Sequence, residues 1–374
     1  MNTHSNLTAK SLTHPSTITD RLPLGLVGLN FGRWMALHYL LLEPGINYFS
    51  LNALCDENPA RLQNLKEELG PRFTGETYTS LDEMLEDPGI KVVGLFTGPI
   101  KRAELIRKII HRGKDVITTK PFEIDAKAAR VVLKEAEELG RVVVLNSPAP
   151  VLRPDLAKIF EWQKEYDLGQ AIAARGEVTA DYFETADGGW YDDRELCPVA
   201  PLFRLGIYLI NDLGNFFQGA ESVVVQHSRL RTGRPTPDHA QAGIRYRNGS
   251  LVNIFASFCV GDGDWYRNGL TINFERGTVY REMGPVRTDP PRLTLIGNNS
   301  ERKRDVLAEF VIPQASDSYP WAQFHDLMHG RKPAHLTTHE QIVEGICIIN
   351  ALSRAELGNG VAQVEMPRLK AEVE

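Results

Sequence analysis

Two residues suggest acid–base chemistry on a hydroxyl group. Lys120 ends an apolar run and directly precedes Pro121, which restricts the lysine backbone to extended conformations. Tyr208 lies in the apolar segment 202–217. A free tyrosine titrates at about pH 10, but a nearby ammonium such as that of Lys120 can lower the pKa of a hydroxyl and orient it. For Lys120 alone, a surface lysine paired with Glu123 is the simpler alternative.

A polar stripe crosses the otherwise apolar segment 202–217, which is predicted to be a buried helix. Arg204, Tyr208 and Asp212 recur at every fourth position. Each of these groups would cost about 1 to 3 kcal/mol if buried without a partner, so we expect the stripe to face a wet cleft or a polar network. Arg204 could join Lys120 in favouring the phenolate of Tyr208, or it could bind an anionic substrate. The simpler alternative is an ion pair between Arg204 and a carboxylate, with Tyr208 hydrogen-bonded in the core.

A glycine turn near the N-terminus favours a dinucleotide site. The turn follows the apolar run 24–27, and its expected cofactor-binding residues are Gly28, Asn30, Phe31 and Gly32. Free N–H groups at the start of the next helix stabilise a pyrophosphate. The match to G-x-G-x-x-G is imperfect because Asn30 takes the second glycine position and the last glycine comes one place early. Taken alone, the turn is about as consistent with an ordinary strand–turn–helix corner.

Asp56 strengthens the dinucleotide prediction. It follows the apolar run 48–54 and lies 24 residues after Gly32, near the position where such units place the carboxylate that binds the adenosine ribose. Asp56 and its neighbour Glu57 would repel a 2′-phosphate. NAD is therefore favoured over NADP.

Strands and helices alternate through the first half of the chain. Apolar runs at 22–27, 48–54, 92–97, 116–119 and 142–145 predict strands, and segments at 81–85, 101–111 and 125–139 predict helices. The first helix is marked at helical spacing by Trp34, Leu37, His38 and Leu41. This alternation predicts a parallel sheet with helices on both faces and a ligand crevice at the carboxyl ends of the strands. The residues at those ends are Gly28, Asp56, Thr97, Pro99, Lys120 and Asn146.

The regular alternation ends near residue 150, where prolines cluster. We expect a disordered or lightly docked tail at 1–20, a nucleotide-binding Rossmann domain at 21–148 and a substrate-binding and oligomerisation domain at 149–374. The second domain should contain an open, mostly antiparallel sheet built from successive hairpins, with runs at 222–230, 240–246, 251–258, 270–274 and 278–282. The fold class is thus α/β plus α+β. The last helices, one opened by a capping box at 338–341, are expected to pack on the first domain.

Composition excludes several other classes of function. The net charge of −6 gives no basic surface for nucleic acid, and no apolar run reaches the roughly 20 residues of a membrane span. The four cysteines are scattered, which favours reduced thiols, a cytoplasmic protein and no zinc. The spacing of His325, His335 and His339 does not predict a metal site. In the long loop 181–201, Trp190 and Tyr191 could stack on a sugar, and an exposed Trp190 equally suits contact with another subunit.

The order of these motifs resembles the glucose-fructose oxidoreductase and inositol dehydrogenase (Gfo/Idh/MocA) family over most of residues 22–218. The Lys-Pro segment ending at Pro121 carries most of the resemblance, although Thr119 replaces the usual Glu. The resemblance implies that Lys120 lies beside the nicotinamide and the substrate hydroxyl. It also implies that Tyr208 is an acid–base residue, as in the glucose-fructose oxidoreductase branch. The departures are Gly98, inserted in a common Thr-Pro-x-x-x-His run, Arg102 near where the His is common, and Arg204 where an Asp is common.

The leading hypothesis is an NAD-dependent oxidoreductase acting on a secondary hydroxyl of a sugar, sugar acid or polyol. Lys120 and Tyr208 would be catalytic, and the substrate would also meet Arg204, Asp212 and Trp190. A second hypothesis has bound NAD oxidise the substrate transiently to drive elimination, epimerisation or glycoside cleavage. A third is a dinucleotide-binding regulatory protein without activity. From the resemblance we expect a homodimer or homotetramer formed through the second sheet.

Overall fold

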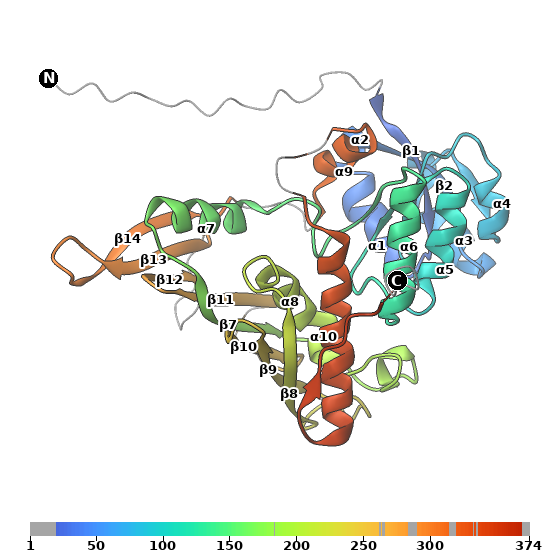
Figure 1. The fold of residues 1–374 in the computed structure, drawn as a ribbon. Coiled ribbons are helices and arrows are strands. Elements are labelled where there is room, and N and C mark those ends of the chain that lie inside the picture. The colour runs from blue at the N-terminus through green and yellow to red at the C-terminus, as the bar shows by residue number, and fades with distance from the viewer. Residues whose placement is uncertain are drawn as a thin grey trace, which may run out of the picture.

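The computed structural model describes residues 20–368, except for 183, 262, 264–265, 283–289, 314–318, 332 and 334–335. The predicted tail, apart from Asp20, lies outside the described residues. Two sheets organise the chain, one parallel and one mostly antiparallel and open, as expected (Figure 1). The α/β plus α+β class is therefore confirmed.

The first sheet contains six parallel strands in the order β3-β2-β1-β4-β5-β6. Its strands are β1 (Leu22–Val27), β2 (Phe49–Cys55), β3 (Glu76–Tyr78), β4 (Val92–Leu95), β5 (Asp115–Thr118) and β6 (Val143–Leu145). The helices that follow these strands include α3 (Pro59–Leu69), α4 (Leu81–Leu85), α5 (Arg102–His111) and α6 (Ala126–Glu138). The sequence predicted every one of these strands except β3, which has three largely exposed residues at the sheet edge and no apolar run.

The first helix buries a different face from the one its spacing suggested. Helix α1 (Phe31–Met35) continues into the π-helical turn η2 (Ala36–Leu40), and the short helix α2 (Gly45–Tyr48) follows. Met35, Ala36 and Leu40 are buried, whereas Trp34 is 47% exposed. A π-helical turn changes the residue spacing from that of an α-helix, so the pattern beginning at Trp34 did not identify the buried side.

The second sheet has nine strands in the order β14-β13-β12-β11-β7-β10-β9-β8-β15. They are β7 (Ala171–Ala180), β8 (Ala220–Ser228), β9 (His239–Tyr246), β10 (Leu251–Ser257), β11 (Tyr266–Phe274), β12 (Gly277–Arg281), β13 (Arg292–Asn298), β14 (Arg304–Val311) and β15 (Ala362–Gln363). The expectation of successive hairpins is wrong at one point. Strand β7 lies between β10 and β11, parallel to β10.

Helices cover one face of this sheet. They are α7 (Pro154–Glu165), the π-helical η5 (Leu202–Gly206), α8 (Ile207–Leu213) and α10 (His339–Gly358). The predicted helix 202–217 is thus divided into η5 and α8 and ends earlier than expected. Along β10, residues alternate between this covered face and a face where Leu251 and Asn253 are exposed.

Two late helices return to the first domain. Helix α10 begins with the predicted capping box, in which Thr338 and Gln341 exchange hydrogen bonds, and it packs against both α6 and β8 (Figure 1). Helix α9 (Trp321–Met328) packs against α2, and its Trp321 and Phe324 lie in the core around β1 and β2. These contacts fix the crevice between the two sheets.

Candidate functional site

A pocket of about 1020 Å³ extends from the glycine turn after β1 to the helix pair η5–α8. The first part of the chain contributes the carboxyl ends of β1, β2, β4 and β5, and the second part contributes the loop after β7 and the start of α8. Predicted site residues that line it are Gly28, Asn30, Phe31, Asp56, Thr97, Pro99, Lys120, Trp190, Arg204 and Tyr208. Gly32, Asn146 and Asp212 do not line the pocket.

The turn after β1 is held by the end of β2. Gly28 has a φ of 85°, and a Cβ there would lie 2.9 Å from the Thr97 nitrogen, so the position requires glycine. One carboxylate oxygen of Asp56 accepts a hydrogen bond from Leu29 N at 2.8 Å, and the other accepts one from Asn58 N at 2.9 Å. Asp56 therefore shapes the turn as well as facing the pocket.

Pocket residues at this end fit a dinucleotide. The hydroxyl of Thr97 is buried and has no hydrogen-bond partner among the described residues, although its residue lines the pocket. A ligand with polar oxygens satisfies such a group. Phe31 is 43% exposed and packs edge-on against Phe96, with ring centroids 5.9 Å apart. Arg61 also lines the pocket, 3.5 Å from Asp56, and was not predicted.

Lys120 and Tyr208 converge in the pocket, as the sequence predicted. The ammonium of Lys120 lies 4.6 Å from the centroid of the Tyr208 ring and donates a hydrogen bond to the Arg204 carbonyl. Asn146, which does not line the pocket, is hydrogen-bonded to both residues. Its amide oxygen accepts from Lys120 N at 3.0 Å, and its amide nitrogen donates to the Tyr208 hydroxyl at 3.3 Å.

Arg102 holds the backbone on both sides of Lys120. It is almost fully buried, and its guanidinium donates to the carbonyls of Thr97, Thr119, Pro121 and Phe122. These carbonyls lie just beyond the ends of β4 and β5. The sequence marked Arg102 only as a departure from a common histidine, and nothing in its spacing indicated a buried clamp.

Burial shifts the pKa values of the two predicted catalytic groups, Lys120 and Tyr208, in opposite directions. Loss of hydration, with a smaller contribution from the positive charge of Arg204, lowers the pKa of Lys120 to about 7. Burial raises the pKa of Tyr208 well above its ordinary value, and neighbouring tyrosines add to the increase. The predicted phenolate at Tyr208 is therefore not favoured. Lys120 is the group of this pair that titrates near neutral pH.

The charge of Arg204 is already paired. Its two terminal nitrogens donate to the Glu184 carboxylate at 2.6 and 2.8 Å, and its guanidinium carbon lies 3.6 Å from the centroid of the Tyr191 ring. This is the structural ion pair that the sequence left as the simpler alternative. Glu184 was not predicted because it comes from the loop after β7, twenty residues before Arg204.

The remaining predicted substrate residues differ in location. Trp190 lines the pocket together with Tyr191 and Tyr182. The three side chains form an aromatic wall. Asp212 lies outside the pocket in a buried ion cluster, where it pairs with Arg153 at 2.7 Å and Arg281 at 3.2 Å. Tyr208 and Asp212 both lie in α8, whereas Arg204 lies in the π-helical turn η5.

Comparison with known families agrees with this geometry. Residues 23–147 match the model described as the oxidoreductase family, NAD-binding Rossmann fold, and residues 156–280 match the GFO/IDH/MocA C-terminal domain. The chain belongs to the Gfo/Idh/MocA family of oxidoreductases. Membership confirms the resemblance seen in the sequence, the oxidoreductase class and the NAD-binding domain.

The individual relatives of this chain are distant. Dehydrogenase aclE from Aspergillus oryzae is 27% identical over 44% of this chain and 46% of its own length, so the match spans less than half of that relative. 1,5-Anhydro-D-fructose reductase from Ensifer adhaerens is 22% identical over 75% of this chain and 83% of its own length. The structure of levoglucosan dehydrogenase in complex with NADH and levoglucosan superposes with a TM-score of 0.71 at 16% identity, covering 92% of this chain and 99% of that one. Such a likeness establishes a shared fold.

No helix within the described part of the chain has the length and apolar character needed to cross a membrane.

Proposed function

We propose that this protein oxidises a secondary hydroxyl of a neutral sugar or polyol with NAD, and that Lys120 is the proton acceptor. The observation that carries the proposal is the position of Lys120. Its amine titrates near neutral pH, lies against Tyr208, and lines the same pocket as Asp56 and the glycine turn.

Bound NAD would supply the hydride acceptor, and residues of the protein accept the proton of the substrate hydroxyl. The substrate hydroxyl gives its proton to the neutral amine of Lys120 while its carbon loses a hydride and becomes a carbonyl. Tyr208 stays a neutral phenol and donates a hydrogen bond to the substrate oxygen. Asn146 and Arg102 keep Lys120 in place through its backbone.

Support for a neutral substrate comes from the charges in the pocket. The guanidinium of Arg204 is engaged at both ends by Glu184 and is covered by the ring of Tyr191. A substrate carboxylate would have to displace Glu184. The aromatic wall of Tyr182, Trp190 and Tyr191 suits the apolar face of a sugar ring.

A substrate screen tests this function. Neutral sugars and polyols and the matching sugar acids are incubated with NAD or NADP, and formation of reduced nicotinamide is followed. We expect net NADH formation with at least one neutral sugar or polyol and lower kcat/KM with its acid. The variant Glu184→Gln frees Arg204. In this variant we expect kcat/KM for the acid to rise by about tenfold relative to kcat/KM for the neutral sugar. A wild-type enzyme that prefers the acid would contradict the proposed substrate class.

Two further points belong to the same proposal. Copies of the chain associate as a homodimer or homotetramer through the uncovered face of the second sheet, where Leu251 and Asn253 are exposed. The protein acts in the cytoplasm, which agrees with four buried cysteines that form no disulfide.

A further inference from the structure

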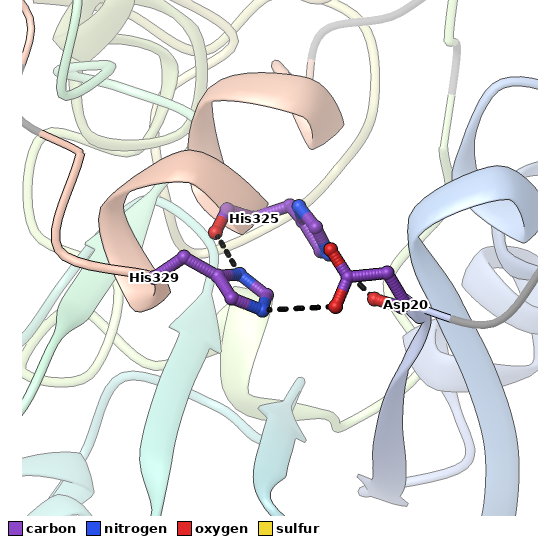
Figure 2. Close-up of side chains that lie close together, drawn as sticks. All are labelled: Asp20, His325 and His329. Carbon is purple, nitrogen blue, oxygen red and sulfur yellow. Dashed lines mark hydrogen bonds and ion pairs between the residues drawn. The ribbon is translucent and has the colours of Figure 1, made fainter. Parts of the chain in front are cut away.

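We propose that Asp20, His325 and His329 form a binding site for a divalent transition-metal ion, with Zn²⁺ as the best fit. Asp20 lies two residues before the start of β1, and the two histidines lie in and just after α9 (Figure 2). One potential ligand atom from each residue lies within 4.8 Å of the other two. None of the three residues lines the pocket described above.

His329 directs one ring nitrogen toward a carbonyl and the other toward a carboxylate. Its Nδ1 donates a hydrogen bond to the His325 carbonyl at 2.8 Å (Figure 2). Its Nε2 lies 3.4 Å from Asp20 Oδ1. A proton or a metal ion can bridge these two atoms, and the Zn²⁺ titration below distinguishes the two. Two ligands each about 2.1 Å from a tetrahedral zinc are about 3.4 Å apart, so the observed separation fits the metal.

His325 is held in position by packing. It is 2% exposed, and its ring lies 5.5 Å from that of Tyr48 and 6.1 Å from that of Phe49. Its Nε2 donates to the Asp20 carbonyl at 2.8 Å, and its Nδ1 lies 3.4 Å from the Arg331 guanidinium. An ion replaces one of these two contacts. The Arg331 side chain is 55% exposed and also pairs with Asp326 at 2.7 Å, so it would keep a carboxylate partner after leaving His325.

The ligand types define the class of ion. Two imidazoles and one carboxylate suit Zn²⁺ and neighbouring transition metals better than Mg²⁺ or Ca²⁺, which prefer oxygen ligands alone. Hydrogen bonds from the second ring nitrogen to a carbonyl, as at His329, are typical of histidines that bind metals. Water would complete the coordination.

Such an ion would have a structural role. It would tie the start of β1 to α9, a helix that returns from the second half of the chain and places Trp321 and Phe324 in the core of the first domain. The sequence did not predict this site because Asp20 is 305 residues from His325. The spacing of the histidines alone gave no reason to combine Asp20 with them.

Calorimetric titration of ZnCl₂ into the full-length, tag-free protein, stripped with EDTA, tests the proposal. We expect one Zn²⁺ to bind per chain and the thermal unfolding midpoint to rise. His329→Gln and Asp20→Asn, both at exposed positions, should weaken Zn²⁺ binding by roughly 100-fold and keep the wild-type unfolding midpoint in EDTA. The control is His111→Gln, an exposed histidine that lies 3.8 Å from Glu135 and should leave binding unchanged.

Two results would overturn the proposal. One is the absence of saturable Zn²⁺ binding by the wild-type protein. The other is equal Zn²⁺ affinity in wild type and His329→Gln, which would place the ion elsewhere. Neither readout depends on turnover, so the outcome is independent of the proposed oxidoreductase reaction.

Discussion

Replacing Lys120 with methionine is expected to lower kcat for sugar oxidation by roughly 10²- to 10⁴-fold, the usual contribution of a positioned proton acceptor. Methionine keeps the length of the side chain but cannot accept the proton. The affinity for NADH, measured by fluorescence titration, should change little, because we propose that the glycine turn and Asp56 bind the other end of the cofactor. The loss should therefore fall on turnover.

A matched substitution separates this effect from a general loss of charge. Lys127 is exposed on α6 and does not line the pocket, so Lys127→Met should retain wild-type kcat. Turnover of Lys120→Met within about tenfold of wild type would remove Lys120 from the reaction. A parallel loss of NADH binding would instead mean that the lysine mainly holds the cofactor.

Replacing Arg281 with methionine is expected to destabilise the fold by about 3 to 5 kcal/mol, because it leaves buried carboxylates with too few partners. Arg281 binds Asp155 at 2.7 Å and Asp212 at 3.2 Å, and all three side chains are 5–6% exposed. Although burial opposes ionisation of Asp155, Arg153 and Arg281 together hold its pKa well below the ordinary value. Urea denaturation at neutral pH measures the loss.

An exposed ion pair provides the comparison for Arg281. Arg276 binds Asp167 at 2.8 Å, but these side chains are 53% and 89% exposed. Arg276→Met should cost less than about 1 kcal/mol. Adding Asp212→Asn to Arg281→Met should recover part of the lost stability, since Arg153 is then left with one buried carboxylate instead of two. Equal losses in the buried and exposed variants would show that the cluster contributes no more than a surface pair.

Local patterns predicted much of the fold. Apolar runs bounded by glycine and proline identified the strands that bind the nucleotide, and the rule that ligands meet strand ends placed Lys120 and Asp56 in one pocket. Strands β13 and β14 were not predicted. They lie at one end of the second sheet, and β14 (RDVLAEFV) mixes charged and apolar residues without a regular alternation.

The chemistry of the site was harder to predict because it depends on partners that are distant in the sequence. Helical spacing put Arg204 and Asp212 on one stripe with Tyr208, but their charges are neutralised by Glu184 and Arg281 from other elements. The sequence gives no measure of how deeply Tyr208 is buried. Burial raises the pKa of Tyr208 and lowers that of Lys120, and for this reason we propose Lys120 and not Tyr208 as the proton acceptor.

The central claim is tested most directly by the pH dependence of kcat/KM for oxidation of a neutral sugar with NAD. Protonated Lys120 cannot accept a proton, so the rate should fall about tenfold per pH unit below an apparent pKa of about 7 and level off above it. The same acidic limb should persist in Tyr208→Phe and disappear from the residual activity of Lys120→Met. A limb that is lost in Tyr208→Phe and retained in Lys120→Met would contradict the assignment of Lys120 as the proton acceptor.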